Sequence, residues 1–388
     1  MTSPFTGSNT SHYYIEEVTP GVTPDNPLWT AIRNTGGIPA IIKDALISDE
    51  LDDSREITGV RVGNEQAQGE YGVELSQTSQ DALIANAMSS SWASGLKLLG
   101  VDVAVTSVSK DFTRTDGGDF ISDGVEVGDL IRFKDLTGDN AIPFIVTQVS
   151  ISTVNGGAIT HKLTDEAVTT DIDTGDKIGT GSECKTMSIL TWLRGKCGTV
   201  DKYVLTKGVE FTGFSFEVAV NAQVTGSFPL LGRTQEFSDT PPTGSTFAAD
   251  LTTRAFAGVD GKVLVDDAIQ AFVTSSTLTN DNEASAQFEL GNKAVSFVER
   301  GRATNTVSMS GFMANTDLIQ RFVNEVETSV AIVLNGLDGA MSFTYPKTFL
   351  TAATPEIGGP TSITQSLEGT ATGNSNQSSV IIQRLPAL

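Results

Sequence analysis

The sequence predicts an all-β protein with one or two short helices, and three observations favour this class. The chain of 388 residues has 38 glycines, and only 19% of its residues are charged, below the usual quarter. Ser, Thr, Asn and Gly take their place, as in proteins with many turns. Short apolar runs alternate with polar residues at a period of two, the pattern of half-buried strands. Apolar residues are spread evenly, so we expect two or three domains with sizeable cores.

The first hundred residues are expected to hold an arm, a hairpin and a helix. Residues 1–35 contain four prolines and are predicted to be an irregular N-terminal arm. Residues 56–63 and 69–76 alternate and predict a β-hairpin that turns around Asn64. A capping-box pattern at 78–81 precedes an apolar helical stripe, which predicts a short helix. The stripe consists of Leu83, Ile84, Ala87 and Met88.

Residues 101–183 change character and are predicted to be an inserted domain. Four short segments separated by turns predict a small β-barrel or sandwich. These segments are 101–105, 125–133, 144–149 and 159–163. The chain is thus divided into a discontinuous β-domain, 1–100 with 184–388, and a small β-domain at 101–183.

Strands resume after the insertion. Phe214, Phe216, Val218 and Val220 alternate with other residues, so one face of their strand is predicted to be buried. A loop is expected at 235–255, which contains a Pro-Pro pair. The further predicted strands are 186–193, 203–211, 224–232, 263–278, 284–290, 329–335, 340–345, 362–367 and 379–385.

A strand followed by a capped short helix occurs twice. Thr306–Ser310 is the second strand, and Asp317 opens the second helix. The apolar face of this helix consists of Leu318, Ile319, Phe322, Val323 and Val326. The first copy is the strand around Val73 and Leu75 with the helix predicted after it. Because both helices begin with a polar cap and an Asp, we interpret the pair as a weak two-fold internal repeat.

The chain is strongly acidic, with 47 Asp and Glu against 25 Lys and Arg and a net charge of −22. A protein that grips nucleic acid needs clustered Lys and Arg, because its affinity comes from counterion release at phosphates. No segment here is basic. No apolar run reaches the ~20 residues of a membrane helix, and Met1–Tyr14 is unlike a secretory signal. We therefore expect a soluble protein made in a cytoplasm, with no membrane contact.

Few residues suggest catalysis. His12 and His161 are the only histidines, and no Ser/His/Asp order, nucleotide-binding glycine loop or G-x-S-x-G occurs. His161 is expected on a strand surface. Cys184 and Cys197 have no C-x-x-C spacing and no neighbouring histidine, so neither a metal site nor a disulfide framework is expected. They are expected to be buried or half-buried thiols. We predict no enzymatic activity and no cofactor.

Two acidic clusters have the oxygens that Ca²⁺ prefers. Residues 49–53 (DELDD) lack the alternating spacing of a calcium loop and are expected to form a solvated loop. Residues 171–176 (DIDTGD) lack the terminal Glu ligand and are expected to form a β-turn. Paired carboxylates for glycoside hydrolysis would need sugar-stacking aromatic residues, and the chain has only 3 Trp and 5 Tyr.

The order of these motifs resembles the tail tube (major tail) proteins of long-tailed bacteriophages. The motifs that carry the resemblance are 69–76 (GEYGVELS), 81–84 (DALI), Gly195, Gly198, Tyr203, Gly208-Val209, 224–228 (VTGSF) and Gly232. The segment 123–131 (DGVEVGDLI) is similar to small β-domains of the same proteins. The resemblance covers most of residues 10–388 and rests on order. Many tube proteins lack such an insertion, which leaves open whether it projects outward or contacts neighbours.

The resemblance implies an antiparallel β-sandwich or half-barrel whose inner sheet joins with other copies into a β-barrel around a lumen. Hexameric rings would stack into a hollow tube in the virion tail, after assembly in the host cytoplasm. The implied partners are other copies of the chain, tail terminator and tail-tip or baseplate initiator proteins, and a tape-measure protein in the lumen. Genomic DNA would cross an acidic lumen during ejection without binding.

Residues 1–35 and 36–58 are expected to reach the next ring. The candidates for contacts between subunits are Leu28, Trp29, Ile41, Ile42 and Leu46. Trp29 is the main candidate, because a large aromatic side chain in a loop-like arm gains little unless it is buried in a partner. Packing of Trp29 on its own domain is the equal alternative.

Three other functions are weighed. A bacterial surface protein of the adhesin kind would need a cleaved N-terminal precursor. A capsid decoration protein or minor tail component would form discrete oligomers rather than tubes. A polysaccharide depolymerase would need a carboxylate cleft and would hydrolyse glycans.

Overall fold

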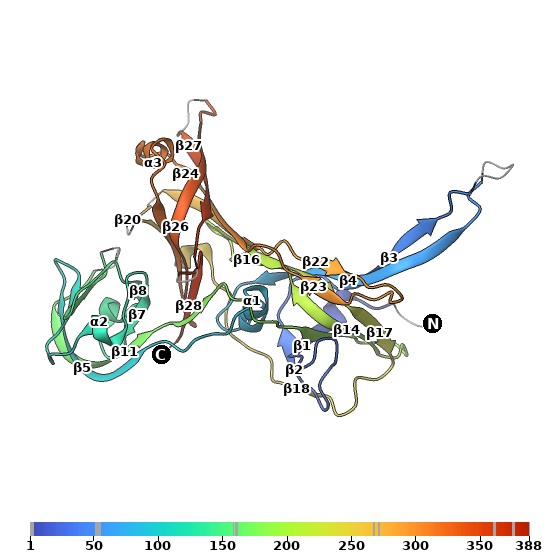
Figure 1. Cartoon of the computed structure of the whole chain (residues 1–388). Coiled ribbons are helices and arrows are strands. Elements are labelled where there is room, and N and C mark those ends of the chain that lie inside the picture. Colours follow the sequence, from blue (N-terminus) through green and yellow to red (C-terminus); the bar gives the residue numbers. More distant parts are fainter. Residues whose placement is uncertain are drawn as a thin grey trace.

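The computed structural model describes residues 4–50, 56–157, 159, 162–266, 268–270, 272–359, 362–374 and 377–387. It is built mainly from β-strands, and the all-β prediction is confirmed. Figure 1 shows a two-part body of strands, a small β-domain on one side and a long hairpin that projects on the other. The body consists of two similar units, which we call the first unit and the second unit.

The first unit contains most strands before residue 250. Its elements are β1 (Thr10–Glu16), β2 (Leu28–Ile32), β3 (Ala40–Ile47), β4 (Val60–Glu74), α1 (Asp81–Ala87), β13 (Met187–Leu193), β14 (Lys202–Phe211), β15 (Gly213–Ala219), β16 (Thr225–Gly232), β17 (Thr234–Ser238) and β18 (Thr246–Phe247).

The second unit contains the remainder of the chain. Its elements are β19 (Gly261–Val265), β20 (Ala268–Ile269), β21 (Val273–Asp281), β22 (Ser285–Gln287), β23 (Phe297–Glu299), β24 (Thr304–Phe312), α3 (Asp317–Val323), β25 (Thr328–Gly336), β26 (Gly339–Glu356), β27 (Thr364–Ala371) and β28 (Ile381–Pro386). Strand β12 (Asp176–Gly179) comes before β13 in the chain, but it pairs with β28 of the second unit.

The two units repeat the same strand pairings. Strand β1 pairs with β2 and β13, as β19 pairs with β20 and β25. Strands β3, β4 and β16 are neighbours in that order, as are β21, β24 and β27. Strand β14 lies between β13 and β17, as β26 lies between β25 and β28. The predicted repeat of a strand and a short helix is therefore part of a duplication of the whole unit.

The irregularities of the strands are duplicated as well. The register shifts between Met187 and Ile189 opposite β14, and between Thr328 and Val330 opposite β26. Both helices have seven residues and begin with an Asp, at Asp81 and Asp317 in agreement with the predicted helix starts. A bulge is a specific feature of backbone geometry, so its recurrence at the same place indicates a true structural repeat.

One sheet runs through both units. Its strand order is β3-β4-β16-β15-β21-β24-β27-β26, where β26 contributes its C-terminal half, Thr348–Glu356. We call these eight strands the shared sheet. The two units meet where β15 pairs with β21, antiparallel from Gly213 opposite Asp281 to Ala219 opposite Ser275.

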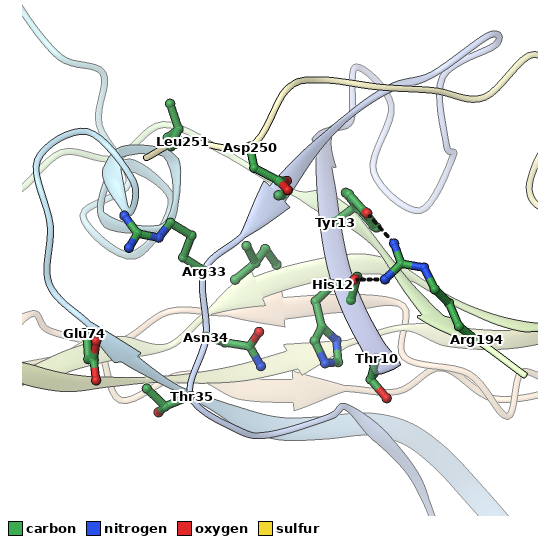
Figure 2. A pocket seen from close by; sticks show the side chains of 13 residues that line it. Thr10, His12, Tyr13, Arg33, Asn34, Thr35, Glu74, Arg194, Asp250 and Leu251 are labelled. Atoms are coloured by element: carbon green, nitrogen blue, oxygen red, sulfur yellow. Dashed lines mark hydrogen bonds between the residues drawn. The ribbon is translucent and has the colours of Figure 1, made fainter. Parts of the chain in front are cut away.

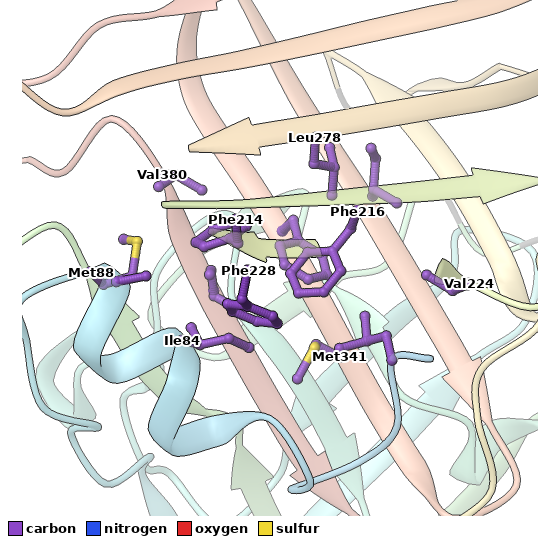
Figure 3. Close-up of a cluster of buried hydrophobic side chains, with 14 of the residues drawn as sticks. Ile84, Met88, Phe214, Phe216, Val224, Phe228, Leu278, Met341 and Val380 are labelled. Atoms are coloured by element: carbon purple, nitrogen blue, oxygen red, sulfur yellow. The ribbon is translucent and has the colours of Figure 1, made fainter. Parts of the chain in front are cut away.

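One face of the shared sheet is packed into the main core. Phe214, Phe216 and Phe228 have 2% or less of their surface exposed, and their rings contact one another. Figure 3 shows these rings below Leu278 and beside Ile84 of α1 and Met88, the residue after α1. Burial of such side chains contributes roughly 2–3 kcal/mol each. The predicted alternation is thus confirmed for Phe214, Phe216 and Val218, whereas Val220 lies beyond β15 and is exposed.

The inserted residues form a separate seven-stranded sheet with its own core. Its strands follow the order β8-β7-β11-β5-β6-β10-β9. The elements are β5 (Lys97–Thr106), β6 (Asp111–Arg114), α2 (Phe120–Asp123), β7 (Leu130–Phe133), β8 (Phe144–Ile145), β9 (Gln148–Val149), β10 (Thr153–Asn155) and β11 (Glu166–Thr174). The single-turn helix α2 was not predicted. Of the strand expected at 159–163, residues 160 and 161, the latter His161, lie outside the described residues, and residues 159, 162 and 163 belong to no strand.

The small β-domain docks on the second unit. Leu130 and Ile145 pack with Leu264, Ala331 and Leu385 in a separate apolar cluster. The backbone N–H of Leu130 donates to the buried Gln383 side chain at 2.8 Å. The side chain of Asn335 donates to the carbonyl of Pro143 at 3.0 Å. This side of the second unit lies opposite the core face of its sheet, so the insertion covers the outside of the body.

Several local predictions were wrong. Residues 1–35 are not irregular, because β1 and β2 lie within them. No turn occurs around Asn64: β4 runs unbroken through it, since β3 pairs with its first part and β16 with its second. The loop expected at 235–255 contains β17 and β18. Both cysteines are exposed rather than buried.

Candidate assembly surface

The second face of the shared sheet carries mainly polar side chains on its six central strands, from β4 to β27. Side chains directly opposite one another share a face, so the strand register identifies the members of each row. One row contains Glu74, Thr225, Glu217, Thr277, Ser308 and Glu368. The next row contains Gly72, Ser227, Ser215, Thr279, Thr306 and Thr370. No Lys or Arg occurs in either row, so this polar face combines hydroxyl groups with carboxylates.

The shared sheet ends in two open edges. Strand β3 pairs only with β4 among the described strands, from Ala40 opposite Gln68 to Ile47 opposite Val60. At the far end, β27 is the single partner that the described part of the chain gives to the C-terminal half of β26, from Phe349 to Glu356. Open edges carry unpaired N–H and C=O groups and favour the addition of another strand. The polar face and the two edges together suit a sheet that continues from chain to chain.

The hairpin of β3 and β4 projects from the body and exposes apolar side chains. Figure 1 shows that it extends away from both units. The exposed fractions of Ile42, Leu46 and Ile47 are 47%, 57% and 56%, and Val60 and Val62 on the paired strand are 64% and 49% exposed. By the strand register, Ile47, Val60 and Val62 share one face of the hairpin and Leu46 lies on the other. An exposed apolar patch on a projecting hairpin marks a protein contact. The candidates Ile42 and Leu46 therefore lie on exposed surface, and the candidate Ile41, which precedes Ile42, is half-buried.

The two candidates on β2 differ sharply in exposure. Leu28 is 57% exposed, whereas Trp29 is fully buried in its own chain. The Trp29 indole packs with Tyr13, Leu190 and Tyr203, and its N–H donates to the Ser245 hydroxyl at 2.9 Å. Of the two alternatives for Trp29, the structure therefore shows the second, in which the side chain packs on its own domain. The side chain leaves no surface for a partner, because β1, β13 and β14 form a sheet that residues 245–248 cover.

A pocket beside β1 contains His12. It is lined by Ser11, His12, Arg33, Arg194 and Asp250, among others. Arg194 donates to the Ser11 hydroxyl and to the Tyr13 hydroxyl, and Figure 2 shows Arg194 beside Tyr13. The His12 ring lies in the buried wall, with Nδ1 3.0 Å from the Thr191 hydroxyl. Burial lowers the pKa of His12 to about 4, so the ring is neutral at pH 7. These contacts hold His12 within the fold.

The acidic segment 171–176 is not a turn. Residues 171–174 belong to β11, and Asp173 is buried beside Arg132 at 3.5 Å and Lys134 at 3.0 Å. Asp176 accepts a hydrogen bond from Gly95 N and lies 3.4 Å from Arg384. Residues 49–53 lie partly outside the described chain. Within the described ranges, no group of His, Cys, Asp and Glu side chains has an arrangement that could hold a metal ion.

These features define a class: an all-β subunit with a duplicated body, a sheet that is open at both ends and an apolar hairpin that projects from it. The sequence model of the family described as phage tail tube protein matches residues 7–371. The chain belongs to this family and is a structural protein of the virion tail. The match spans both units and the insertion. A search of curated proteins finds no match. Among the described residues, no helix is long and apolar enough to cross a membrane.

Proposed function

We propose that this chain forms rings that stack into the hollow tube of a phage tail, with the polar face of the shared sheet turned toward the lumen. The observation that carries the proposal is the combination of one buried face, one polar face and two open edges in a single sheet. A sheet of this kind satisfies its edge groups when copies close into a barrel, because closure removes all edges. The ring that the family resemblance implies has six-fold symmetry.

The charge of the polar face supports passage of DNA. Glu70, Glu217, Glu356 and Glu368 are exposed on it, beside rows of Ser and Thr. Duplex DNA carries a phosphate charge about every 1.7 Å along its axis, so Lys and Arg in a lumen would bind it by releasing counterions. A wall of carboxylates and hydroxyl groups offers no such contact. The DNA would therefore move through with its own water and counterions.

Stacking is assigned to the projecting hairpin. The exposed apolar residues of its outer part, Leu46 and Ile47 among them, would be buried against the next ring, with Leu28 a further contact. Burial of apolar surface contributes roughly 25 cal/mol per Å², so a few such side chains supply several kcal/mol per contact. The insertion docks on the outside of the second unit, and it would decorate the outer surface of the tube.

The partners follow from this role. Terminator and tail-tip or baseplate initiator proteins would contact the two ends of the tube, and a tape-measure protein would occupy the lumen during assembly. Assembly would take place in the host cytoplasm before the tail joins the virion. DNA would be a transient passenger.

Electron microscopy of the purified protein at high concentration tests the proposal. We expect hollow tubes or stacked rings in negative stain. A protein that stays monomeric, with or without the tail initiator, would contradict it. The Leu46→Asp variant should fold normally and form fewer or shorter tubes, because a charge in the stacking contact is costly to bury.

The polarity of the lumen is tested with DNA. Tubes of the Glu217→Lys/Glu368→Lys variant should retain short duplex DNA at low salt and release it as salt rises, whereas wild-type tubes should not retain it. Asp139→Lys, on the exposed surface of the insertion, is the matched control and should behave as wild type. Equal retention by the control and the Glu variant would place the polar face outside the lumen.

A further inference from the structure

The duplication shows how one unit joins another. Within the chain, β15 of the first unit pairs with β21 of the second. The second unit has an equivalent of β15, the C-terminal half of β26, and the first unit has an equivalent of β21, which is β3. Both of these strands lie at open edges. Each chain therefore contains one completed junction and the two halves of another.

The equivalent residues follow from the register. Ser215 of β15 lies opposite Ser227 of β16, and Thr354 of β26 lies opposite Ser366 of β27. Each residue of the second pair therefore comes 139 positions after its counterpart in the first pair. Thr279 lies opposite Thr306, and Ala40 lies opposite Gln68. Gln68 and Thr306 are themselves equivalent, because Gly72 and Ser310, four residues further along, face Ser227 and Ser366. Thr354 thus corresponds to Ser215, and Ala40 corresponds to Thr279.

We propose that the C-terminal half of β26 in one copy pairs antiparallel with β3 of the next copy, in the register of the internal junction. Since Ser215 lies opposite Thr279, Thr354 would lie opposite Ala40, and Ala353 opposite Ile41. This inference rests on the proposed function, because it assumes that the copies close into a ring. Beyond that function, it specifies which two edges pair between copies, the register in which they pair and the number of chains in a ring.

The side chains at the two edges are complementary. Inside the chain, the large Phe214 lies opposite the smaller Asn280 on the core face. At the proposed junction the small Ala353, which packs against the main core, would lie opposite the larger Ile41. The larger side chain moves from one strand to the other, so the proposed pair again combines one large and one small side chain on the core face.

Two prolines limit the pairing of the free edges. In the internal junction, Asn282 N donates to Thr212 O and Val220 N donates to Thr274 O, both at 3.0 Å. Pairs with and without backbone hydrogen bonds alternate along an antiparallel ladder, so Phe216 and Leu278 are also a hydrogen-bonded pair. In the free edges, Pro355 of β26 is the equivalent of Phe216, and Pro39 before β3 is the equivalent of Leu278. Each proline lacks the N–H that would point outward. Proline is a common protection of exposed edges, so these two weaken indiscriminate pairing before assembly.

The number of chains in a ring follows from the duplication. Each chain supplies eight strands, so three chains supply the six units of a six-fold ring. With strands about 4.8 Å apart and tilted by about 40°, three chains give a barrel roughly 50 Å across at the backbone. Six chains would give a barrel roughly 100 Å across, far wider than a DNA duplex. We infer three chains per ring in place of the six that the resemblance implies.

Disulfide crosslinking tests both the register and the number. Cysteines at Thr354 and Ala40 would face each other in a pair without backbone hydrogen bonds, where side chains are closest. The double variant, Ala40→Cys/Thr354→Cys, is made with Cys184→Ser and Cys197→Ser, since both native thiols are exposed. Tubes of this protein are oxidised, dissolved in detergent and separated without reductant. We expect a ladder that ends at a species of about three times the 40.9 kDa chain mass.

The controls separate this inference from the proposed function. The single-cysteine variants should give no ladder, and Ile42→Cys/Thr354→Cys, displaced by two residues, should give at least tenfold less product. Tubes that form without any crosslink would overturn the edge pairing while leaving the tube itself intact. A ladder that continues to six chains would overturn the count of three. Failure of the wild-type protein to assemble would contradict the proposed function and, with it, this junction.

Discussion

Arg300 and Glu210 form a buried ion pair that connects the two units, with 3.0 Å between Nε and Oε2. Glu210 lies on β14 of the first unit, and Arg300 follows β23 of the second. The guanidinium also donates to the carbonyl of Asn86 at the end of α1, at 2.8 Å. Asn86 in turn accepts a hydrogen bond from Phe211 N at 2.7 Å. This network holds α1 against β14.

Removal of Arg300 should destabilise the subunit. Arg300→Ala leaves a buried carboxylate without its partner, and such losses cost about 3–5 kcal/mol. Urea unfolding followed by circular dichroism should show a clearly lower midpoint than wild type. Arg254→Ala, which removes an exposed pair with Asp338, is the control and should change little. Equal midpoints for the two variants would contradict the role of the network.

The stability that Arg300→Ala loses should depend on pH in a definite direction. Burial already raises the pKa of Glu210 above its usual range in the wild type, and Arg300 opposes this rise. Without Arg300 the folded-state pKa rises further above the unfolded value. The contribution of Glu210 to stability is then fully present below the pKa of Glu210 in the unfolded chain, and it is lost as the pH rises through the pKa of Glu210 in the folded chain. The deficit of Arg300→Ala should therefore be larger at pH 7 than at pH 4.

His12 should make the subunit less stable in acid. Its folded-state pKa of about 4 lies below the unfolded value of 6.5, so the unfolded state binds more protons between these values. Stability falls as pH drops from about 7 to 4, by at most about 3 kcal/mol. His12→Gln should lose this part of the pH dependence, which the difference between the two unfolding curves measures. Parallel curves would show that His12 does not titrate in this way.

Trp29 and Leu28 should affect different properties. Trp29→Ala removes a fully buried side chain and should lower the free energy of unfolding by about 3–5 kcal/mol. Leu28→Ser changes an exposed side chain and should shift it by less than about 0.5 kcal/mol. If Leu28 contacts a neighbouring ring, Leu28→Ser should instead reduce tube formation. Thermal melts and tube yield, measured on both variants, separate the two effects.

Gln383 should secure the inserted domain. Gln383 is fully buried, and its side chain binds Leu130 N at 2.8 Å and Asp129 Oδ1 at 3.3 Å. Gln383→Ala leaves the buried N–H of Leu130 without its partner, at a cost of about 1–3 kcal/mol, whereas Asp129 keeps its ion pair with Lys177. Hydrogen exchange should become faster in β7 and β8 and stay unchanged in β13. Gln320→Ala on α3 is an exposed control. Unchanged exchange in β7 would contradict the proposed docking role.

Much of the fold follows from local pattern. Alternation at Phe214, Phe216 and Phe228 marked the buried face, because a strand turns successive side chains to opposite sides. The stripe from Leu83 to Met88 located α1 to within a few residues. Other features had no local signal. Strand β4 continues past Asn64 since partners on both sides satisfy its backbone, which overrides a turn preference.

The sequence alone determined that the protein is all-β, that it is acidic without a basic segment, and that a strand and a short helix recur. These properties depend on composition and on periods of a few residues. Only the tertiary structure decided that Trp29 is buried, that the duplication includes the main strands of each unit, and that β3 and the end of β26 are left open. Which strand pairs with which depends on contacts between residues far apart in the chain, and no local pattern specifies them.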